Sequence, residues 1–143
     1  MKFLREITRK FKYNLKFLSK NKNIKLNYVV NSSSNSKLTE LMNFYGSDKG
    51  GRNNHHNYSE YYSELFFNER KNIKNFLEIG LGTNDVNMLS NMGEKGIPLA
   101  SLKAWRDYFE NAIIYGADID KKILKNHERI KTYFVDQTDP KTI

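Results

Sequence analysis

The sequence contains no cysteine, which excludes disulfide bonds and cysteine-ligated metal centres and is typical of proteins of the reducing cytoplasm. It also lacks any apolar run near the roughly 20 residues that a membrane-spanning helix needs. The first 18 residues, MKFLREITRKFKYNLKFL, lack the continuous apolar stretch and the small-residue cleavage site of a signal peptide. We therefore expect a cytoplasmic protein.

Positive charge is concentrated at one end of the chain. The net charge is +8, and residues 1–30 hold nine of the 24 lysines and arginines but only one of the 16 acidic residues. The remainder is therefore electrically neutral. A nucleic-acid-binding domain spreads its basic residues over a folded face among stacking aromatic residues. No such pattern follows Ser36, so we expect no nucleic-acid partner.

Residues 1–20 combine this charge with apolar residues at helical spacing: Phe3, Leu4, Ile7, Phe11, Leu15 and Leu18. Such a helix could pack on its own domain or on a partner, remain a frayed tail, or lie peripherally on the inner membrane surface. The stretch NSSSNS at 31–36 is typical of a linker. We therefore divide the chain into a basic arm with its linker (1–35), a helical lid or entrance segment (36–70) and a sheet domain (71–143).

Two helices are expected before the first strand. Ser36 can cap a helix that Gly46 ends, and its apolar face would carry Leu38, Leu41, Met42 and Tyr45. A polar loop follows at 47–57. Asn57 and Glu60 then form the spacing of a capping box. That box would open a second helix with an aromatic face of Tyr58, Tyr61, Tyr62, Leu65 and Phe66.

Short apolar runs then predict three strands, at 76–79, 113–116 and 130–135. Ser101 is placed to cap a helix between the first two strands, and the stretch DKKILKNHE at 120–128 predicts a short helix between the last two. Strands that alternate with helices form parallel sheets. The expected fold class is α/β, a partial Rossmann-like parallel sheet of three strands preceded by helices.

The first strand leads into a turn with few side chains, in the stretch NFLEIGLGTNDVN. Gly80 and Gly82 let a ligand approach the backbone at the carboxyl edge of the sheet, where such folds bind small molecules. Asp118 ends the second strand, where a carboxylate can accept hydrogen bonds from both hydroxyls of a ribose. These positions predict a nucleoside site, although a tight turn without a ligand is the alternative.

Two nucleoside ligands compete for this turn. A dinucleotide site uses the pattern G-x-G-x-x-G, with an acid about 20 residues further on. Here Asp85 occupies the third position, where its charge would oppose a pyrophosphate, and Asp118 lies much further along the chain. S-adenosylmethionine has no phosphate, and Glu78 could face its cationic end. The residues therefore favour S-adenosylmethionine, and an NAD-type oxidoreductase fragment is the alternative.

The motifs LEIGLGTN, SLKAWRDYF, IYGADID and RIKTYFVDQTD, in this order, resemble class I S-adenosylmethionine-dependent methyltransferases. Together with the upstream YGSDKG and HHNYSEYYSELF, they resemble most closely the branch that contains the macrocin and mycinamicin sugar O-methyltransferases. The similarity covers about residues 38–140. It implies an enzyme that methylates a hydroxyl of a sugar or of a surface-polysaccharide precursor, and an oligomer is compatible with it.

The resemblance also implies a role for individual residues. Gly80 and Gly82 would pass under the methionine part of the cofactor, with Glu78 on the same strand end, and Asp118 would hold the ribose. Asp136 and Gln137 would lie near the adenine. The entrance loop over the cofactor would contain Asp48, Lys49, His56 and Tyr58.

The family sheet has seven strands, of which this chain supplies three. In that family a divalent metal, its acidic ligands and a histidine base come from segments beyond the third strand. We therefore expect a truncated cofactor-binding part that is inactive alone, with no catalytic residue and no metal ligand assigned. His55 and His56 are adjacent, which suits joint chelation poorly. A module that only docks on a membrane through residues 1–20 is the non-enzymatic alternative.

Overall fold

The structure is a computed structural model that describes residues 36–52 and 56–143. Residues Asn31–Val135 contain one compact unit, and the C-terminal segment Asp136–Ile143 lies outside it. The basic helix expected in residues 1–20 falls outside the described residues and stays a prediction. No helix of the described part is long and apolar enough to cross a membrane.

Two helices precede the sheet, as expected: α2 (Lys37–Tyr45) and α3 (Tyr58–Phe66). The Ser36 hydroxyl accepts a hydrogen bond from the Thr39 N–H at 3.1 Å, and Gly46 ends α2 in the left-handed conformation. The predicted capping box of α3 is wrong in its bonding. Asn57 precedes the helix, but its side chain caps no backbone N–H and instead contacts the Glu60 carboxylate.

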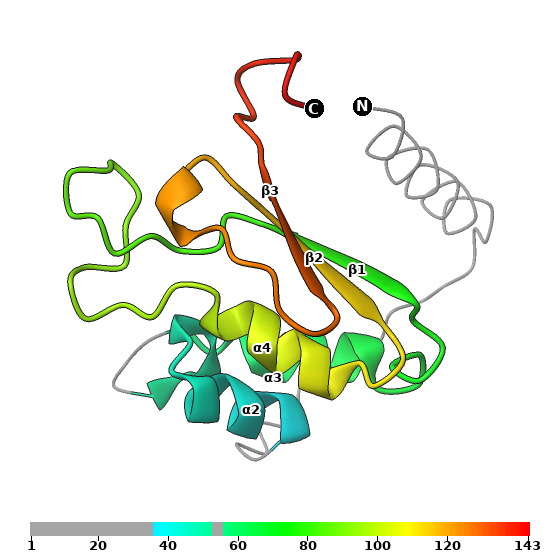
Figure 1. The fold of residues 1–143 in the computed structure, drawn as a ribbon. Coiled ribbons are helices and arrows are strands. Elements are labelled where there is room, and N and C mark those ends of the chain that lie inside the picture. Colours follow the sequence, from blue (N-terminus) through cyan, green and yellow to red (C-terminus); the bar gives the residue numbers. More distant parts are fainter. Residues whose placement is uncertain (1–35, 53–55) are drawn as a thin grey trace, which may run out of the picture. The chain divides into compact units, whose positions relative to one another are not determined.

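The sheet has three parallel strands in the order β1 (Asn75–Ile79), β2 (Ile113–Asp118) and β3 (Ile130–Phe134). Gly116 pairs with Glu78 on one side and with Thr132 on the other. The partial Rossmann-like α/β fold predicted from the sequence is therefore confirmed. Figure 1 shows the strands side by side, with their carboxyl ends at one edge.

The helix between the first two strands is α4 (Ala100–Tyr108), and it begins two residues earlier than a helix capped by Ser101 would. Leu99 precedes it in the left-handed conformation, with φ 64°, and Ser101 lies inside the first turn rather than at the cap. Between the last two strands the structure has only a 3₁₀ turn, η3 (Lys121–Ile123), where a helix was predicted for 120–128. Asp120 caps that turn by accepting from the Lys122 N–H at 2.9 Å, and the chain then continues as a loop.

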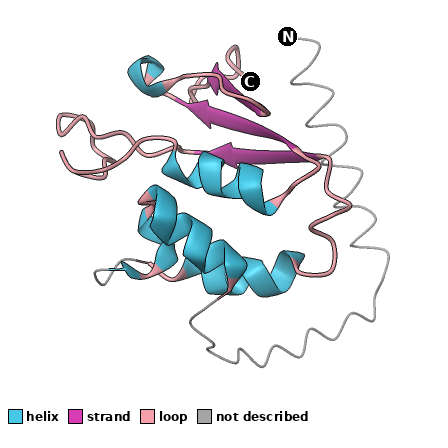
Figure 2. Ribbon diagram, turned by 60° about the horizontal axis from the view of Figure 1, so that its bottom comes forward, coloured by secondary structure: helices cyan, strands magenta, loops and turns pink. Residues whose placement is uncertain are grey.

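The core lies between α4 and the sheet, and Figure 2 shows α2, α3 and α4 on one side of the strands. Trp105 stacks on Phe109 with ring centroids 5.4 Å apart and lies 4.6 Å from the ring of Phe76. Phe66 of α3 meets the same rings edge to face. Such aromatic contacts add to the free energy gained by burial. Only 2% of Trp105 is exposed, so its indole fills the core.

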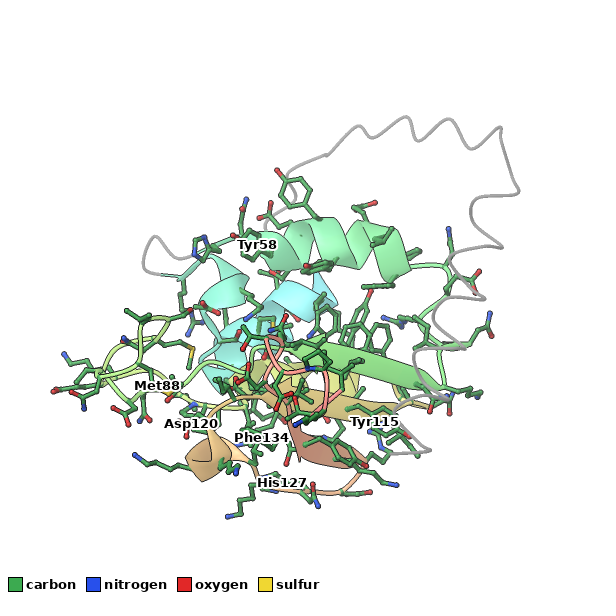
Figure 3. The ribbon with its side chains drawn as sticks, turned by 90° about the horizontal axis from the view of Figure 1, so that it is seen from above. Tyr58, Met88, Tyr115, Asp120, His127 and Phe134 are labelled. Carbon is green, nitrogen blue, oxygen red and sulfur yellow. The ribbon has the colours of Figure 1, made fainter. Side chains whose placement is uncertain are left out.

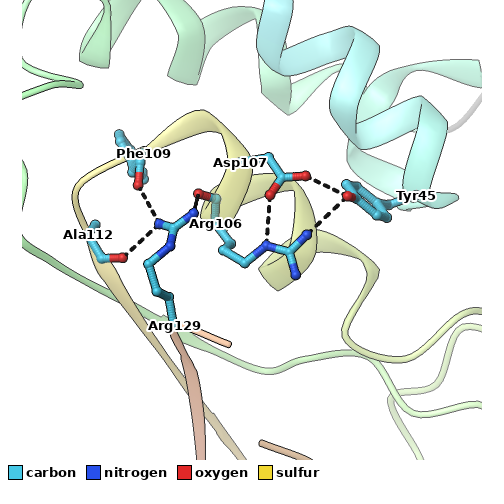
Figure 4. Close-up of polar contacts among 6 residues, drawn as sticks. All are labelled: Tyr45, Arg106, Asp107, Phe109, Ala112 and Arg129. Atoms are coloured by element: carbon cyan, nitrogen blue, oxygen red, sulfur yellow. Dashed lines mark hydrogen bonds and ion pairs between the residues drawn. The ribbon is translucent and has the colours of Figure 1, made fainter. Parts of the chain in front are cut away.

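A polar cluster joins α2 to α4 (Figure 4). The Tyr45 hydroxyl donates to Asp107 at 2.5 Å, and the Arg106 guanidinium donates to Asp107 at 2.7 Å and to the Tyr45 oxygen at 3.1 Å. The hydrogen bond from Arg106 holds the pKa of Asp107 below its ordinary value. The two helices are therefore fixed by polar contacts at their surface as well as by the core.

Arg129 closes the carboxyl end of α4. Its guanidinium donates to the carbonyl oxygens of Arg106, Phe109 and Ala112, at 2.9, 3.0 and 3.0 Å (Figure 4). The last carbonyls of a helix have no partner within the helix. Arg129 satisfies the carbonyl of Arg106 in the last turn and also binds the carbonyls of Phe109 and Ala112, which follow the helix. A cation at this end also interacts favourably with the helix dipole.

Replacing Arg129 with methionine keeps the aliphatic stem but removes these donors. We expect the free energy of unfolding to fall by about 2 kcal/mol, because part-buried carbonyls lose their partners. Urea denaturation measures the change. Arg52→Met, at an exposed arginine, is the matched control and should shift the value by less than about 0.5 kcal/mol. Equal effects of the two substitutions would contradict the capping role.

Candidate functional site

The turn after β1 contains two glycines with different environments. Gly80 and Gly82 have φ of 83° and 76°, which other residues adopt only with strain. A Cβ on Gly80 would meet no protein atom within 4 Å, so the backbone there faces open space. A Cβ on Gly82 would lie 2.4 Å from the Met92 sulfur. The backbone at Gly80 is thus open to solvent, whereas Gly82 leaves space that the Met92 side chain occupies.

Asp118 fastens this turn to the end of β2. The Leu81 N–H donates to Asp118 Oδ2 at 2.6 Å, and the Asp120 N–H donates to Oδ1 at 2.8 Å. Only 8% of Asp118 is exposed. An ionised carboxylate has about four acceptor positions, so these two bonds leave capacity for further donors. The structure therefore brings the predicted acid and the predicted glycine turn together.

Two residues that the sequence analysis did not assign to the site reinforce this connection. Thr83 and Asp120 are both buried, and the Thr83 hydroxyl donates to Asp120 Oδ2 at 2.6 Å. The stretch ADID, with acids at positions 118 and 120, could have indicated that Asp120 belongs beside Asp118, because residues two apart on a strand share a face. Asp118 and Asp120 thus form consecutive anchors between the β1 loop and the β2 end.

Glu78 is the other acid at this edge, and only 11% of its side chain is exposed. Its Oε1 accepts from the Ser101 hydroxyl of α4 at 2.9 Å and lies 3.5 Å from the Lys49 Nζ. Its second oxygen, Oε2, is buried without a hydrogen-bond partner. Burial raises the pKa of Glu78 above its ordinary value, and the attraction of Lys49 opposes that rise.

Lys49 comes from η1 (Asp48–Gly50), the turn that follows α2. Burial acts to lower the Lys49 pKa, but the carboxylates of Glu78 and Asp48 together raise it above the ordinary value. Lys49 is therefore charged at neutral pH and lies between two acids, 3.2 Å from Asp48 Oδ1. The predicted entrance segment thus reaches the end of β1 through Lys49.

The remaining predicted residues have contacts of their own. Tyr58 begins α3, is 46% exposed and stacks on His56 at 4.8 Å; Figure 3 shows it well apart from Asp120. Asp136 and Gln137 belong to the C-terminal segment, where Asp136 accepts from the N–H and the hydroxyl of Thr138. Their assignment to the adenine stays a prediction.

A pocket of about 480 Å³ lies next to the loop after β1. It is lined by Asp85 and Asp120 together with the basic side chains of Lys103, Lys122 and His127. Lys122 donates to Asp85 at 3.0 Å, which holds the pKa of Asp85 below its ordinary value. Glu78, Gly80 and Asp118 do not line this pocket.

Within residues 36–52 and 56–143, no three histidine or acidic side chains are grouped closely enough to hold a metal ion. The edge of the sheet carries charged and hydrogen-bonding groups that can recognise a ligand. It presents an open backbone turn, a carboxylate with spare acceptor capacity, and an ion pair with one unpartnered oxygen.

No family model matches the sequence. Two curated proteins that are similar to the chain are both O-methyltransferases. The chain is 31% identical over 99 residues, 69% of its length, to 8-demethyl-8-alpha-L-rhamnosyl tetracenomycin-C 2'-O-methyltransferase of Streptomyces olivaceus. It is 32% identical over 109 residues, 76% of its length, to demethylmacrocin O-methyltransferase of Streptomyces fradiae. These matches cover 23% and 25% of the two relatives, so the chain spans about a quarter of their length.

Solved structures of the MycE methyltransferase from the mycinamycin biosynthetic pathway have a similar fold. The complex with Mg, SAH and mycinamycin VI gives a TM-score of 0.56 at 28% identity over 73% of this chain. A complex with Mg and SAH gives 0.57 at 30% identity over the same share. Each match covers 26% of the solved chain.

The raised pKa of Glu78 makes stability depend on pH. The folded state binds this proton more tightly than the unfolded state, whose ordinary pKa is 4.5. The contribution of Glu78 to the free energy of unfolding therefore falls as pH rises above about 4.5 through the raised value. We expect Glu78→Gln to become more stable relative to the parent protein between pH 5 and pH 8.

Urea denaturation at several pH values tests this expectation. Glu128→Gln, at an exposed glutamate, is the matched control for the substitution itself. A stability difference for Glu78→Gln that does not change with pH would contradict the raised pKa of Glu78.

Proposed function

Because this chain is related in sequence and fold to the S-adenosylmethionine-dependent O-methyltransferases of the macrocin and mycinamicin type, we propose that it forms the cofactor-binding part of a sugar O-methyltransferase. Its cofactor is S-adenosylmethionine, and its acceptor is a sugar or a surface-polysaccharide precursor. The observation that carries the proposal is the bond from the Leu81 N–H to Asp118, which holds the open turn at Gly80 against a carboxylate.

The geometry of the edge supports a division of roles. Gly80 leaves space where the methionine part of the cofactor would cross the backbone, and Asp118 has acceptor capacity for the ribose hydroxyls. Asp136 and Gln137 would contact the adenine, and Asp48 and Tyr58 would belong to the entrance.

The reaction transfers the sulfonium methyl group to a hydroxyl oxygen. An O–CH₃ bond forms as the S–CH₃ bond breaks, S-adenosylhomocysteine leaves, and the hydroxyl proton passes to a base. That base must lie within about 3 Å of the hydroxyl. We assign this role to no residue of the described part. The contribution of this chain is to hold and orient the cofactor, which is a large part of such catalysis.

The alternative, a dinucleotide-dependent oxidoreductase, fits the same edge less well. Asp85 stands where the fingerprint needs its third glycine, and its carboxylate there accepts from the Asn87 N–H and from Lys122. A pyrophosphate would meet this negative charge. The relatives found by comparison are also methyltransferases.

Binding of S-adenosylhomocysteine to the full chain, measured by isothermal titration calorimetry, tests the proposal. We expect Gly80→Ala to weaken binding about tenfold or more, because the added methyl group enters the ligand's space. Gly93→Ala is the matched control, since Gly93 also has a positive φ (73°) and an open Cβ position. The two substitutions carry similar backbone strain. Equal loss in both variants, or binding of NADH without any binding of S-adenosylhomocysteine, would contradict the proposed site.

The basic segment 1–20 supports a compatible proposal, peripheral contact with an anionic membrane, where glycan precursors are often made. The full chain should co-sediment with vesicles that contain anionic lipid at low salt, and deletion of residues 1–20 should abolish this. Failure of the full chain to sediment would remove the membrane role without affecting the cofactor site.

A further inference from the structure

The pocket beside the loop after β1 has more positive than negative side chains. Lys103 lines it from the first turn of α4, and Lys122 and Lys125 line it from η3 and the loop that follows η3. Its two acids are Asp85 and Asp120. The residues that the sequence analysis assigned to the cofactor lie outside this lining. Three ammonium groups therefore face two carboxylates in a cavity that has no role yet.

Both acids of the pocket already have donors within the protein. Asp120 Oδ2 accepts from the Thr83 hydroxyl at 2.6 Å, and its Oδ1 accepts from the Lys122 N–H at 2.9 Å. Asp85 Oδ1 accepts from the Asn87 N–H at 3.1 Å, and its Oδ2 accepts from the Lys122 ammonium group at 3.0 Å. Each carboxylate oxygen therefore has a partner, and the charge of Lys122 is used by Asp85.

The ammonium groups of Lys103 and Lys125 have no such partner. Within the part of the chain that the structure describes, neither group makes a hydrogen bond or an ion pair. Lys103 is half-buried on α4, and Lys125 is exposed. Two unpaired positive charges match a group with two negative charges, as a phosphate monoester or a diphosphate has. A single carboxylate would leave one of them unpaired.

Two further features of the lining favour such an anion on a larger molecule. Helix α4 begins beside Leu99, so the positive end of its dipole adds to the attraction. The volume of about 480 Å³ lies within the roughly 300–1,000 Å³ of small-molecule sites, so the pocket has room for more than a phosphate. The remaining wall is largely apolar and consists of Pro98, Leu99, Ile123 and Leu124.

We propose that this pocket binds the phosphate or diphosphate group of the acceptor, and that the acceptor is therefore a phosphate-linked sugar precursor. Lys103 and Lys125 donate to the phosphate oxygens, and the apolar wall contacts the group to which the phosphate is joined. Asp85 belongs both to the lining and to the loop that follows the open turn at Gly80, so the bound acceptor lies beside that loop. The inference rests on the proposed function, because it assumes that the ligand is a methyl acceptor.

Isothermal titration calorimetry of the full chain with inorganic pyrophosphate tests the site. We expect Lys103→Met and Lys125→Met each to weaken pyrophosphate binding about fivefold or more, since each removes one charged donor. Lys131→Met is the matched control, because Lys131 is exposed on β3 and lies outside the lining. It removes the same charge and should weaken binding less than about twofold. This control separates the pocket from attraction to the net charge or to the basic segment 1–20.

Another variant should bind pyrophosphate more tightly, which a misfolded protein would not do. Asp85→Asn removes a negative charge from the pocket and frees the ammonium group of Lys122. We therefore expect the affinity for pyrophosphate to rise about threefold or more. Glu64→Gln, at an exposed glutamate of α3, is the matched control and should leave the affinity within about twofold. An unchanged affinity in Asp85→Asn would contradict an anion in this pocket.

Two diphosphate esters then show what the phosphate is joined to. Uridine diphosphate carries the group on a nucleoside, and farnesyl diphosphate carries it on a short lipid. The ester that matches the acceptor should bind more tightly than pyrophosphate, and Lys103→Met should weaken its binding by a similar factor. If both esters bind more weakly than pyrophosphate, the pocket accepts only a free anion and the assignment to the acceptor is wrong.

Binding of S-adenosylhomocysteine separates this inference from the proposed function. Lys103→Met and Lys125→Met should bind it as tightly as the parent protein does. If the parent protein binds S-adenosylhomocysteine but not pyrophosphate, or if both variants bind pyrophosphate as Lys131→Met does, the inference is wrong while the cofactor site stands. If the parent protein does not bind S-adenosylhomocysteine, the proposed function fails, and the assignment of the pocket to an acceptor fails with it.

Discussion

The hydrogen bond between the Leu81 N–H and the Asp118 carboxylate is the contact on which the candidate site depends. It joins a loop after β1 to the end of β2 and fixes the conformation of a turn that has almost no side chains of its own. The bond from Thr83 to Asp120 repeats the connection two residues further along both segments. Without these contacts the glycines would give only flexibility. With them, the turn is an open surface at a defined distance from an acid.

Helix α4 contacts both the edge of the sheet that carries the candidate site and the helices that precede the sheet. Its aromatic side chains pack on the sheet, Ser101 in its first turn orients Glu78, and Arg129 satisfies the carbonyls at its other end. The helix also carries Asp107, which binds Tyr45 of α2. The position of η1, which follows α2 and contains Lys49, therefore depends on how α2 packs against α4. The distance between Lys49 and Glu78 therefore depends on how the core packs.

The loop between η3 and β3 shows where sequence periodicity gave the wrong answer. Residues 120–128 contain good helix formers, but the structure has only a 3₁₀ turn, after which Asn126 binds the Thr132 N–H and His127 bridges to Ile130. These contacts turn the chain directly into β3. A helix needs an apolar face to bury, and this segment has only Ile123 and Leu124 for one. Helix propensity was therefore overridden by the short distance to the next strand.

The sequence by itself determined the order of the strands and of the main helices, the ends of α2 at Ser36 and Gly46, the parallel sheet, and the acid and glycine positions at its edge. These follow from periodicity and turn chemistry, which act over a few residues. Only the tertiary structure decided that Ser101 binds Glu78 instead of capping α4, that Gly82 accommodates Met92, and that Lys49 shares its charge between two acids. Such pairings join residues far apart in the sequence. Their geometry is set by how α2, α4 and β1 pack, and no local pattern contains that information.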